Sequence, residues 1–305
     1  MNARERVASA INHKVADKIP CGEIIIDDTV VRDFLACNDV DFEKRYRFIQ
    51  RLGLDIICLP LFFSMNSEKH SLPLVAEAEW KDIDKWVNQT DLFVFIMLDG
   101  CYAWGTKLLG FNKFLAKVNR KGSDLDEFML SVEQFNLKLA ERAVAKGTMG
   151  IIIADDVAYR NGLMVSPSQW REILFPSLRR LVAGISAMKI PLFFHSDGNV
   201  NEVLDDIVKA GFDGLQGIES AAGMDIGLIK RHYGKHLCLW GNLDPRYLVM
   251  PHNRQQLLEQ VNAIKLSAAY GGGFIFGTSS GLFKGVRPEN LRAVYGVKER
   301  FQETC

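Results

Sequence analysis

Short apolar runs alternate with segments of helical periodicity along the whole chain. Most of the runs are continuously apolar, which is typical of parallel strands that are covered on both faces. Eight strands are expected, at residues 22–26, 56–59, 92–98, 150–154, 191–195, 214–218, 237–241 and 273–277. Eight β/α units predict an α/β fold, a (β/α)₈ barrel formed as a single domain over residues 1–305, and an open doubly wound sheet is the alternative.

Capping signals mark several of the helices between these strands. Ser166 followed by proline predicts an N-cap with proline in the first turn, and Pro176 is expected to kink the helix that follows. Asn199 is expected to cap the next helix, and Gly211 is expected to end it. Such signals fit helices that return the chain from one parallel strand to the next.

The charge balance limits the classes of function. The chain has 305 residues, with 37 Lys+Arg against 37 Asp+Glu and 48% hydrophobic residues. This balance argues against a nucleic-acid binder, because such proteins usually carry a basic surface. The apolar runs are strand-sized, and no basic segment followed by an apolar one opens the chain, so we expect no membrane span, no signal peptide and a cytoplasmic location.

Six cysteines are scattered along the chain without a CxxC pair. This arrangement predicts reduced thiols and no disulfides. Cys21, Cys58 and Cys238 lie in or beside predicted strands and are expected as small buried side chains.

Polar side chains gather where the predicted strands end. In a barrel of this kind the reacting groups lie on the loops after the strands. The residues found there are largely acidic: Glu23, Asp27, Asp28, Asp99, Asp155, Asp156, Tyr159, His195, Asp197, Glu219, Asn242, Asp244, Thr278, Ser279 and Ser280. We therefore expect an acidic rim at one end of a neutral protein.

His195 is the most informative residue of this rim. It ends the apolar run 190–194, and Asp197 follows two residues later. With Glu219 on the next strand, one nitrogen and two carboxylates converge, which is a ligand set for Zn²⁺ or a similar divalent ion. The alternative is that His195 is bonded to a neighbouring carboxylate as part of the rim structure.

Asp155 and Asp156 follow the predicted strand 150–154 directly. Adjacent carboxylates raise one another's pKa values, so this pair is a candidate for general acid/base catalysis or substrate contact. The structural alternative is that Asp156 accepts bonds from loop amides while Asp155 faces a basic residue such as Arg160. The loop 277–281 is interpreted as a tight turn in preference to a phosphate site, because it lacks a P-loop lysine.

Aromatic residues flank the same strand ends. Phe62, Phe63, Phe194, Trp240, Phe276 and Phe283 are interpreted mainly as core residues. A pocket for a flat substrate, lined by about two of them, is the alternative.

Several stretches together resemble the uroporphyrinogen decarboxylase superfamily. The resemblance covers essentially the whole chain and implies a (β/α)₈ barrel. Each stretch is weak alone, but their order is specific: 4–13 with 17–20, 155–159, 194–199, 241–245, and 277–281 with 287–290.

Two departures place the chain within that superfamily. True decarboxylases carry an arginine-rich segment after the first strand, whereas residues 22–28 here are acidic and contain no arginine. The coenzyme M methyltransferases hold zinc with a His-x-Cys pair and a later Cys, and His195 matches that histidine. Asp197 and Ser280 stand where the two cysteines would be. A His/carboxylate set suits an oxygen substrate better than a thiol, so the chain is more similar to the O-demethylase methyltransferases.

The resemblance implies a methyl transfer from a methoxylated, aromatic compound to the cobalt of a corrinoid carried by a partner protein. Metal at His195, Glu219 and Asp197, or a protonated carboxyl of Asp155 or Asp156, would polarise the ether oxygen. The residues expected to contact the substrate are Tyr159, Asn242, Glu23 and Ser280. A porphyrinogen decarboxylase and a non-catalytic binding paralogue are the alternatives, and the resemblance also allows a homodimer.

Overall fold

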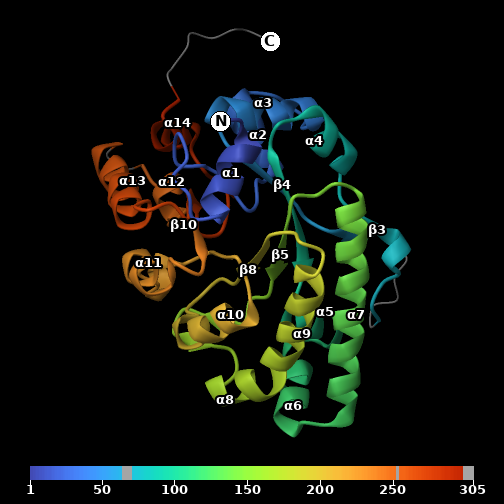
Figure 1. The fold of residues 1–305 in the computed structure, drawn as a ribbon. Helices are drawn as coiled ribbons and strands as arrows, with labels where there is room; N and C mark the ends of the chain where they lie inside the picture. The colour runs from blue at the N-terminus through green and yellow to red at the C-terminus, as the bar shows by residue number, and fades with distance from the viewer. Residues whose placement is uncertain (64–70, 252–253, 298–305) are drawn as a thin grey trace.

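A parallel sheet that curls on itself forms the centre of the molecule (Figure 1). The computed structural model describes residues 1–63, 71–251 and 254–297. The sheet contains seven strands in the order β1-β4-β5-β8-β9-β10-β11, and every pairing is parallel. Their bounds are Ile56–Leu59 (β1), Phe93–Asp99 (β4), Gly150–Ala154 (β5), Leu192–His195 (β8), Gly214–Gln216 (β9), Cys238–Leu243 (β10) and Phe274–Thr278 (β11). The predicted α/β barrel is therefore confirmed.

The prediction of a strand at residues 22–26 was wrong. The segment occupies the eighth position of the barrel, but it pairs with the β11 side at only two bridges, Cys21 to Phe276 and Ile26 to Leu282. No backbone hydrogen bond joins residues 22–26 to β1 in the part of the chain that the structure describes. Without a continuous ladder on either side, the segment closes the barrel without forming a strand.

The barrel interior is a separate apolar core. Alternate residues of the strands point inward, and they form one cluster with residues of α1 (Ala3–Ile11). Within it, Phe95 contacts Phe193 and Trp240 with ring centroids 5.3 and 5.6 Å apart. Since Val7 of α1 is fully buried in this cluster, α1 fills the end of the barrel where the strands begin. The strand ends at the opposite mouth are left for chemistry.

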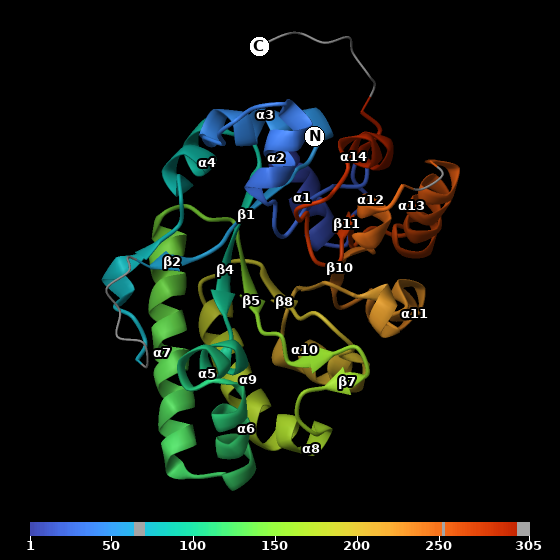
Figure 2. The same ribbon diagram turned by 180° about the vertical axis from the view of Figure 1, so that it is seen from behind.

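Helices surround the sheet (Figure 2), and a second, larger apolar cluster lies between the sheet and these helices. The helices are α2 (Asp28–Leu35), α3 (Phe42–Leu52), α4 (Ile83–Gln89), α5 (Cys101–Leu109), α6 (Phe111–Arg120), α7 (Ser123–Ala145), α8 (Pro167–Gln169), α9 (Phe175–Ser186), α10 (Leu204–Ala210), α11 (Ile226–Tyr233), α12 (Arg246–Val249), α13 (Arg254–Ala268) and α14 (Pro288–Tyr295). Short 3₁₀ turns lie at Val75–Glu77, Asn201–Val203 and Ser220–Ala222. Two small antiparallel pairs, β2 (Phe62–Phe63) with β3 (Ala78–Glu79) and β6 (Ala158–Tyr159) with β7 (Gly162–Leu163), complete the fold.

The capping predictions meet the structure in two different ways. Ser166 caps α8 in a capping box with Gln169, and a π-helical turn, Trp170–Leu174, separates α8 from α9 just before Pro176. Proline has no N–H to donate, so it interrupts the regular helical hydrogen bonds, and a π turn accommodates this interruption. The predicted distortion of the helix near Pro176 is therefore present. Asn199 does not cap α10, because its side chain accepts from the Asn201 amide in the preceding 3₁₀ turn.

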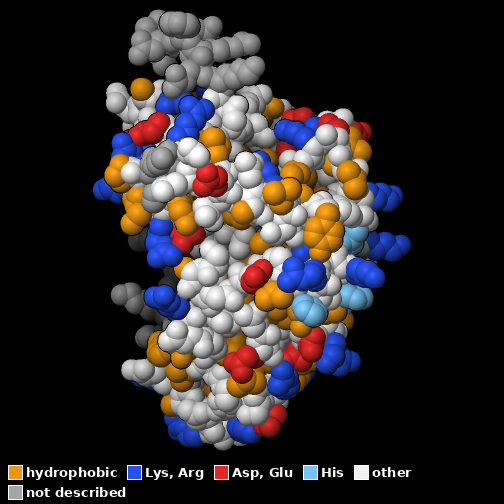
Figure 3. Space-filling model, turned by 90° about the vertical axis from the view of Figure 1, so that its left-hand side faces the viewer, with side chains coloured by type: hydrophobic (Ala, Val, Ile, Leu, Met, Phe, Trp, Pro, Cys, Tyr) orange, Lys and Arg blue, Asp and Glu red, His pale blue; other side chains and the backbone are white. Residues whose placement is uncertain are grey.

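The surface matches the neutral composition. On the face that carries α11 and α13, basic and acidic side chains are scattered among hydrophobic ones, and neither sign forms a continuous field (Figure 3). Among the described helices, none is long and apolar enough to span a membrane. Cys21, Cys58 and Cys238 are free thiols, and Cys305 lies outside the described residues.

Candidate metal centre

Three side chains from two neighbouring strand ends meet at the barrel mouth. Asp156 follows β5, His195 ends β8 and Asp197 follows it, and one ligand atom from each lies within 4.8 Å of the others. Strands β5 and β8 are paired with Ala154 opposite His195, so the register itself brings the groups together. His195 is buried, Asp197 is half-buried and Asp156 is exposed, so the cluster opens to solvent on one side.

The orientation of the His195 ring is fixed from below by Gln216 on β9. The Gln216 amide nitrogen faces the carbonyl oxygens of Ser279 at 3.1 Å and Thr278 at 3.4 Å, so its amide oxygen faces the histidine. Nδ1 of His195 hydrogen-bonds that oxygen and must therefore carry a proton. Nε2 is left facing the carboxylates, 3.7 Å from Asp156 Oδ1, as metal-binding histidines are arranged.

Asp197 supplies the strongest evidence that the cluster takes a cation. Its Oδ1 atom is buried and has no hydrogen-bond partner among the described residues. Burial raises the pKa of its carboxyl, and the carboxylates of Asp156 and Glu219 raise it further, while His195 and a hydrogen bond from Ser280 oppose the shift. An unpartnered buried oxygen among like charges is costly unless a cation or a proton neutralises it, so the residues present fit a metal ion.

The two flanking carboxylates are tied to the loop after β8. Asp156 Oδ1 accepts from the Asp197 amide at 2.9 Å, and Glu219 Oε2 accepts from the Gly198 amide at 3.0 Å. Of the expected ligand set, the structure brings His195 and Asp197 together. It adds Asp156, whereas Glu219 lies outside the group of three and steadies the loop.

Asp155 points away from the metal cluster. Its carboxylate accepts from the backbone amides of Ala103 at 2.7 Å and Tyr102 at 3.4 Å in the first turn of α5. Burial raises its pKa to about 7. A Cβ at Gly100 would lie 2.2 Å from this carboxyl, so glycine is needed there. The structural alternative is thus half right: Asp156 accepts a bond from a loop amide, but Asp155 faces the positive end of a helix and not Arg160.

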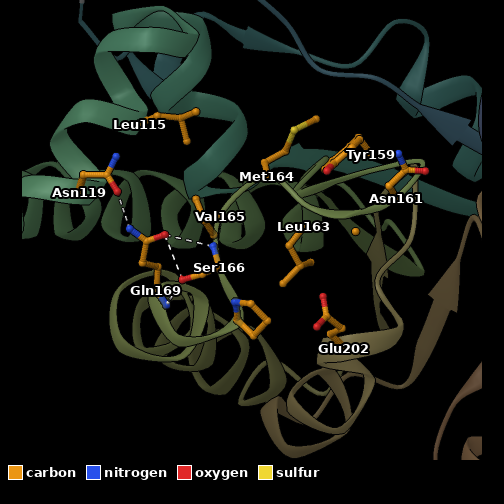
Figure 4. A pocket seen from close by; sticks show the side chains of 12 residues that line it. Leu115, Asn119, Tyr159, Asn161, Leu163, Met164, Val165, Ser166, Gln169 and Glu202 are labelled. Carbon is orange, nitrogen blue, oxygen red and sulfur yellow. Dashed lines mark hydrogen bonds between the residues drawn. The ribbon is translucent and has the colours of Figure 1, made fainter.

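The other expected substrate contacts are dispersed around the mouth. Tyr159 lies on the β6–β7 hairpin, 47% exposed, and lines a cavity of about 420 Å³ with Met164, Leu163 and Glu202 (Figure 4). Its carbonyl accepts from Asn199, which attaches the hairpin to the loop after β8. Tyr159 is thus beside the metal cluster but opens onto a different hollow.

Asn242 and Ser280 lie closer to the interior. Asn242 donates to the Ile218 carbonyl at 3.1 Å, and its Oδ1 is a second buried oxygen without a partner among the described residues. Ser280 lies close enough to the Asp197 carboxylate to lower its pKa, so it borders the metal cluster from the β11 side. These two positions surround the cluster with hydrogen-bonding groups.

Glu23, the fourth expected substrate contact, is bonded within the protein and does not join the metal cluster. Its buried carboxylate accepts from the amide and hydroxyl of Thr278 and from the Tyr295 hydroxyl on α14. Burial raises its pKa to about 7. The same bonds place a carboxylate against the 277–281 loop, and Gly281 donates to the Thr278 hydroxyl, as the tight-turn interpretation requires.

Four of the six flanking aromatic residues belong to the core or pack against it. Phe194, Trp240 and Phe276 are fully buried and Phe63 packs against the core, whereas Phe283 is 41% exposed and Phe62, 53% exposed, lines a cavity beside β1. The residue that sequence reasoning missed is Gln216. A lone amide at an inward position of an otherwise apolar strand was the signal that could have revealed it.

The fold and the site define an α/β barrel with a nitrogen–oxygen ligand cluster at the carboxyl ends of its strands. The family described as Uroporphyrinogen decarboxylase (URO-D) matches residues 68–300. The chain therefore belongs to that family, as the resemblance predicted.

The relatives differ in what they do. The chain is 25% identical over 235 residues to "Methylcobamide:CoM methyltransferase MtaA" of Methanosarcina barkeri, covering 77% of this chain and 65% of that protein. It is 29% identical over 150 residues to a uroporphyrinogen decarboxylase of Pseudomonas fluorescens, covering 47% of this chain and 41% of the relative. The chain thus spans just under two thirds of the length of the methyltransferase.

The solved structure of a methyltransferase from Methanosarcina mazei has the same fold. It superposes with a TM-score of 0.75 at 18% identity and covers 97% of this chain and 98% of its own. At this identity the likeness establishes the barrel alone.

Proposed function

We propose that the chain is a corrinoid-dependent methyltransferase that takes a methyl group from a methoxylated aromatic compound with the help of a divalent metal ion. The observation that carries the proposal is the pair formed by His195 Nε2 and the unpartnered Asp197 Oδ1. The similarity to a methylcobamide:CoM methyltransferase supports the corrinoid, which would be carried by a separate protein at the barrel mouth.

The donor set favours an ether over a thiol. His195, Asp197 and Asp156 offer one nitrogen and two oxygens and no thiolate, and Zn²⁺ or a similar ion bound there would supply Lewis-acid chemistry to an oxygen. Asp197 and Asp156 would balance the ion's charge, and Gln216 would hold His195 in the binding tautomer. Ser280 and Asn242 would orient the substrate, and the Asn242 oxygen is free to accept from it.

The alternative proton donor is less well placed. Asp155 has a pKa of about 7, but its oxygens face the amides of α5. Acid assistance by Asp155 would require its carboxyl to leave these donors.

Decarboxylation of a porphyrinogen is also disfavoured by charge. Two basic side chains near the strand ends are already paired, Lys107 with Asp99 and Arg246 with Asp244. A substrate with eight carboxylates would meet an acidic rim, so incubation with uroporphyrinogen should show no loss of carboxyl groups.

Methyl transfer to free cobalamin tests the proposal. Zinc-loaded protein, a methoxyphenol and cob(I)alamin should form methylcobalamin, followed by its absorbance spectrum. His195→Ala should lose zinc and reduce the rate by at least about 100-fold. His232→Ala, which removes an exposed histidine of α11, is the matched control.

Two results would overturn the proposal. One is full methyl transfer by the His195→Ala protein. The other is a wild-type protein that binds no divalent ion at the His195 cluster by calorimetry.

A further inference from the structure

A partly enclosed cavity lies in the wall of the barrel, beside β1, and opens to the surface next to the exposed side chain of Phe62. It has a volume of about 180 Å³ and lies between segment 22–26, β1 and the first turns of α3 and α4. It exists because residues 22–26 form no backbone hydrogen bonds with β1 in the described chain, so the two segments separate there. None of the metal-cluster residues lines it.

The walls of this cavity are mainly apolar and partly aromatic. Ile24, Ile57 and Leu59 are almost fully buried around it. Phe42 and Trp86 form an adjoining ring pair with centroids 4.5 Å apart. An apolar cavity of about 150 Å³ can hold one benzene molecule. By volume, this cavity therefore has room for a single six-membered ring.

Glu23 is the one charged side chain of the cavity lining that is buried. Its carboxylate lines the cavity and accepts three hydrogen bonds, two from Thr278 and one from Tyr295. Above pH 7, where Glu23 is ionised, its carboxylate has about four acceptor positions, so one remains for a donor from a ligand. A buried acceptor in an apolar cavity selects a molecule that carries one O–H group.

Most of the charges at the edge of the cavity are paired, which favours a neutral ligand. Arg45 is bound to Asp28 and to the Ile26 carbonyl, Asp82 is paired with Lys85 and Asp41 with Lys44, while Lys81 is exposed to solvent. Paired charges attract a charged ligand only weakly, because each is already neutralised by its partner.

We propose that this wall cavity binds a single-ring phenol, with its ring among Ile24, Ile57 and Trp86 and its hydroxyl donating to Glu23. The site is separate from the metal cluster and does not rest on the proposed methyl transfer. It would give the protein a second small-molecule site on the same barrel.

Calorimetric titration with phenol tests the site on the full chain. The wild type should bind one phenol, and toluene, which lacks the donor, should bind about 3- to 10-fold more weakly. Val40→Trp, at a half-buried loop position on the cavity edge, should abolish binding of both. Cys58→Leu fills the same cavity from β1 and serves as a second variant in case the first does not fold. Leu266→Trp, an exposed substitution on α13, is the matched control.

The outcomes separate this site from the mouth. Binding that survives His195→Ala and is lost in Val40→Trp or Cys58→Leu supports the proposal. No binding by the wild type, unchanged binding in both filling variants, or loss in His195→Ala with retention in both filling variants would overturn it. Equal affinity for phenol and toluene would overturn the role of Glu23.

Discussion

At the scale of single residues, the proposed metal site depends on Gln216, which lies beneath His195 and away from solvent. Gln216 is fully buried and sets which nitrogen of His195 faces the carboxylates. Replacing it with methionine keeps the volume but removes the acceptor. Gln216→Met should weaken zinc binding about 10- to 100-fold, as losses of such supporting bonds do. Competition with a chromophoric chelator measures this affinity.

A purely structural role for Gln216 would give a different result. In that case Gln216→Met would lower the melting temperature of the metal-free protein, and the zinc affinity of the folded protein would not change. Gln216→Glu keeps an acceptor for Nδ1 but loses the bonds that the amide nitrogen donates to Ser279 and Thr278, so it should recover only part of the affinity.

Glu23 makes stability depend on pH in a direction opposite to that of most carboxylates. Its pKa rises from an ordinary value of 4.5 to about 7 in the folded protein, because it is buried. The folded state then holds a proton that the unfolded state has lost, so the free energy of unfolding falls as pH rises from 4.5 toward 7. One such group contributes a slope of about 1.4 kcal/mol per pH unit. Urea denaturation of Glu23→Gln at several pH values should show a smaller fall.

Glu202→Gln, at an exposed position, is the control for this measurement and should leave the wild-type slope unchanged. A Glu23→Gln protein with the full wild-type slope would show that Glu23 is ionised throughout and that the neighbouring donors outweigh its burial. Asp155, whose pKa is also about 7, would then be the remaining source.

Sequence reasoning placed the residues of the site better than it placed their contacts. His195, Asp197, Asp155 and Asp156 could be located because the ends of parallel strands share one edge. Which way each side chain points depends on local backbone turns, and these sent Asp155 to the start of α5. The spacing of residues along the sequence does not show that the first turn of α5 will lie against Asp155.

At the scale of elements, the regular strands were predictable and the irregular one was not. Seven of the eight apolar runs contain sheet strands, because buried parallel strands leave a strong apolar signal. The run 22–26 is similarly apolar, but whether it forms a strand depends on backbone hydrogen bonds to the neighbouring strands. Its two bridges to the β11 side and lack of bonds to β1 produced a closing segment with a cavity beside it.

The loop after β8 should transmit a backbone change to the metal cluster. Gly198 has a φ of +82°, and a Cβ there would lie 2.7 Å from backbone atoms of Ala158 and Tyr159. Gly198→Ala should therefore displace the loop that holds Asp197 and weaken zinc binding by about tenfold or more, with no ligand changed. Calorimetry of the folded variant measures the loss.

The matched control for that substitution is Gly211→Ala. Gly211 also has a positive φ, +97°, but the nearest atom to an added Cβ is 3.7 Å away, on the Val182 side chain of α9. The control should lose stability through strain alone and keep its zinc affinity. Equal zinc affinities in both variants would contradict the coupling between the β6–β7 hairpin and the cluster.

At the scale of the whole molecule, the two ends of the barrel divide stability from chemistry. α1 fills the end where the strands begin, with Val7 fully buried in the interior core. The carboxylates gather at the other end, where the sequence predicted an acidic rim within a neutral chain. Net charge could not reveal this asymmetry, because an average over the surface hides a cluster that the topology assembles.

Because the cluster joins loops from neighbouring barrel units, metal binding should stabilise the whole fold. A site formed only in the native state adds a free energy of RT ln(1 + [L]/Kd), which is about 2.7 kcal/mol at a free zinc concentration 100 times Kd. Chemical denaturation with and without zinc should show this gain in the wild type and none in Asp197→Asn, which keeps the side chain's shape but removes its charge. An equal gain in both proteins would place the stabilising ion elsewhere, since the Asp197 oxygen that lacks a partner is the atom that gives the cluster its need for a cation.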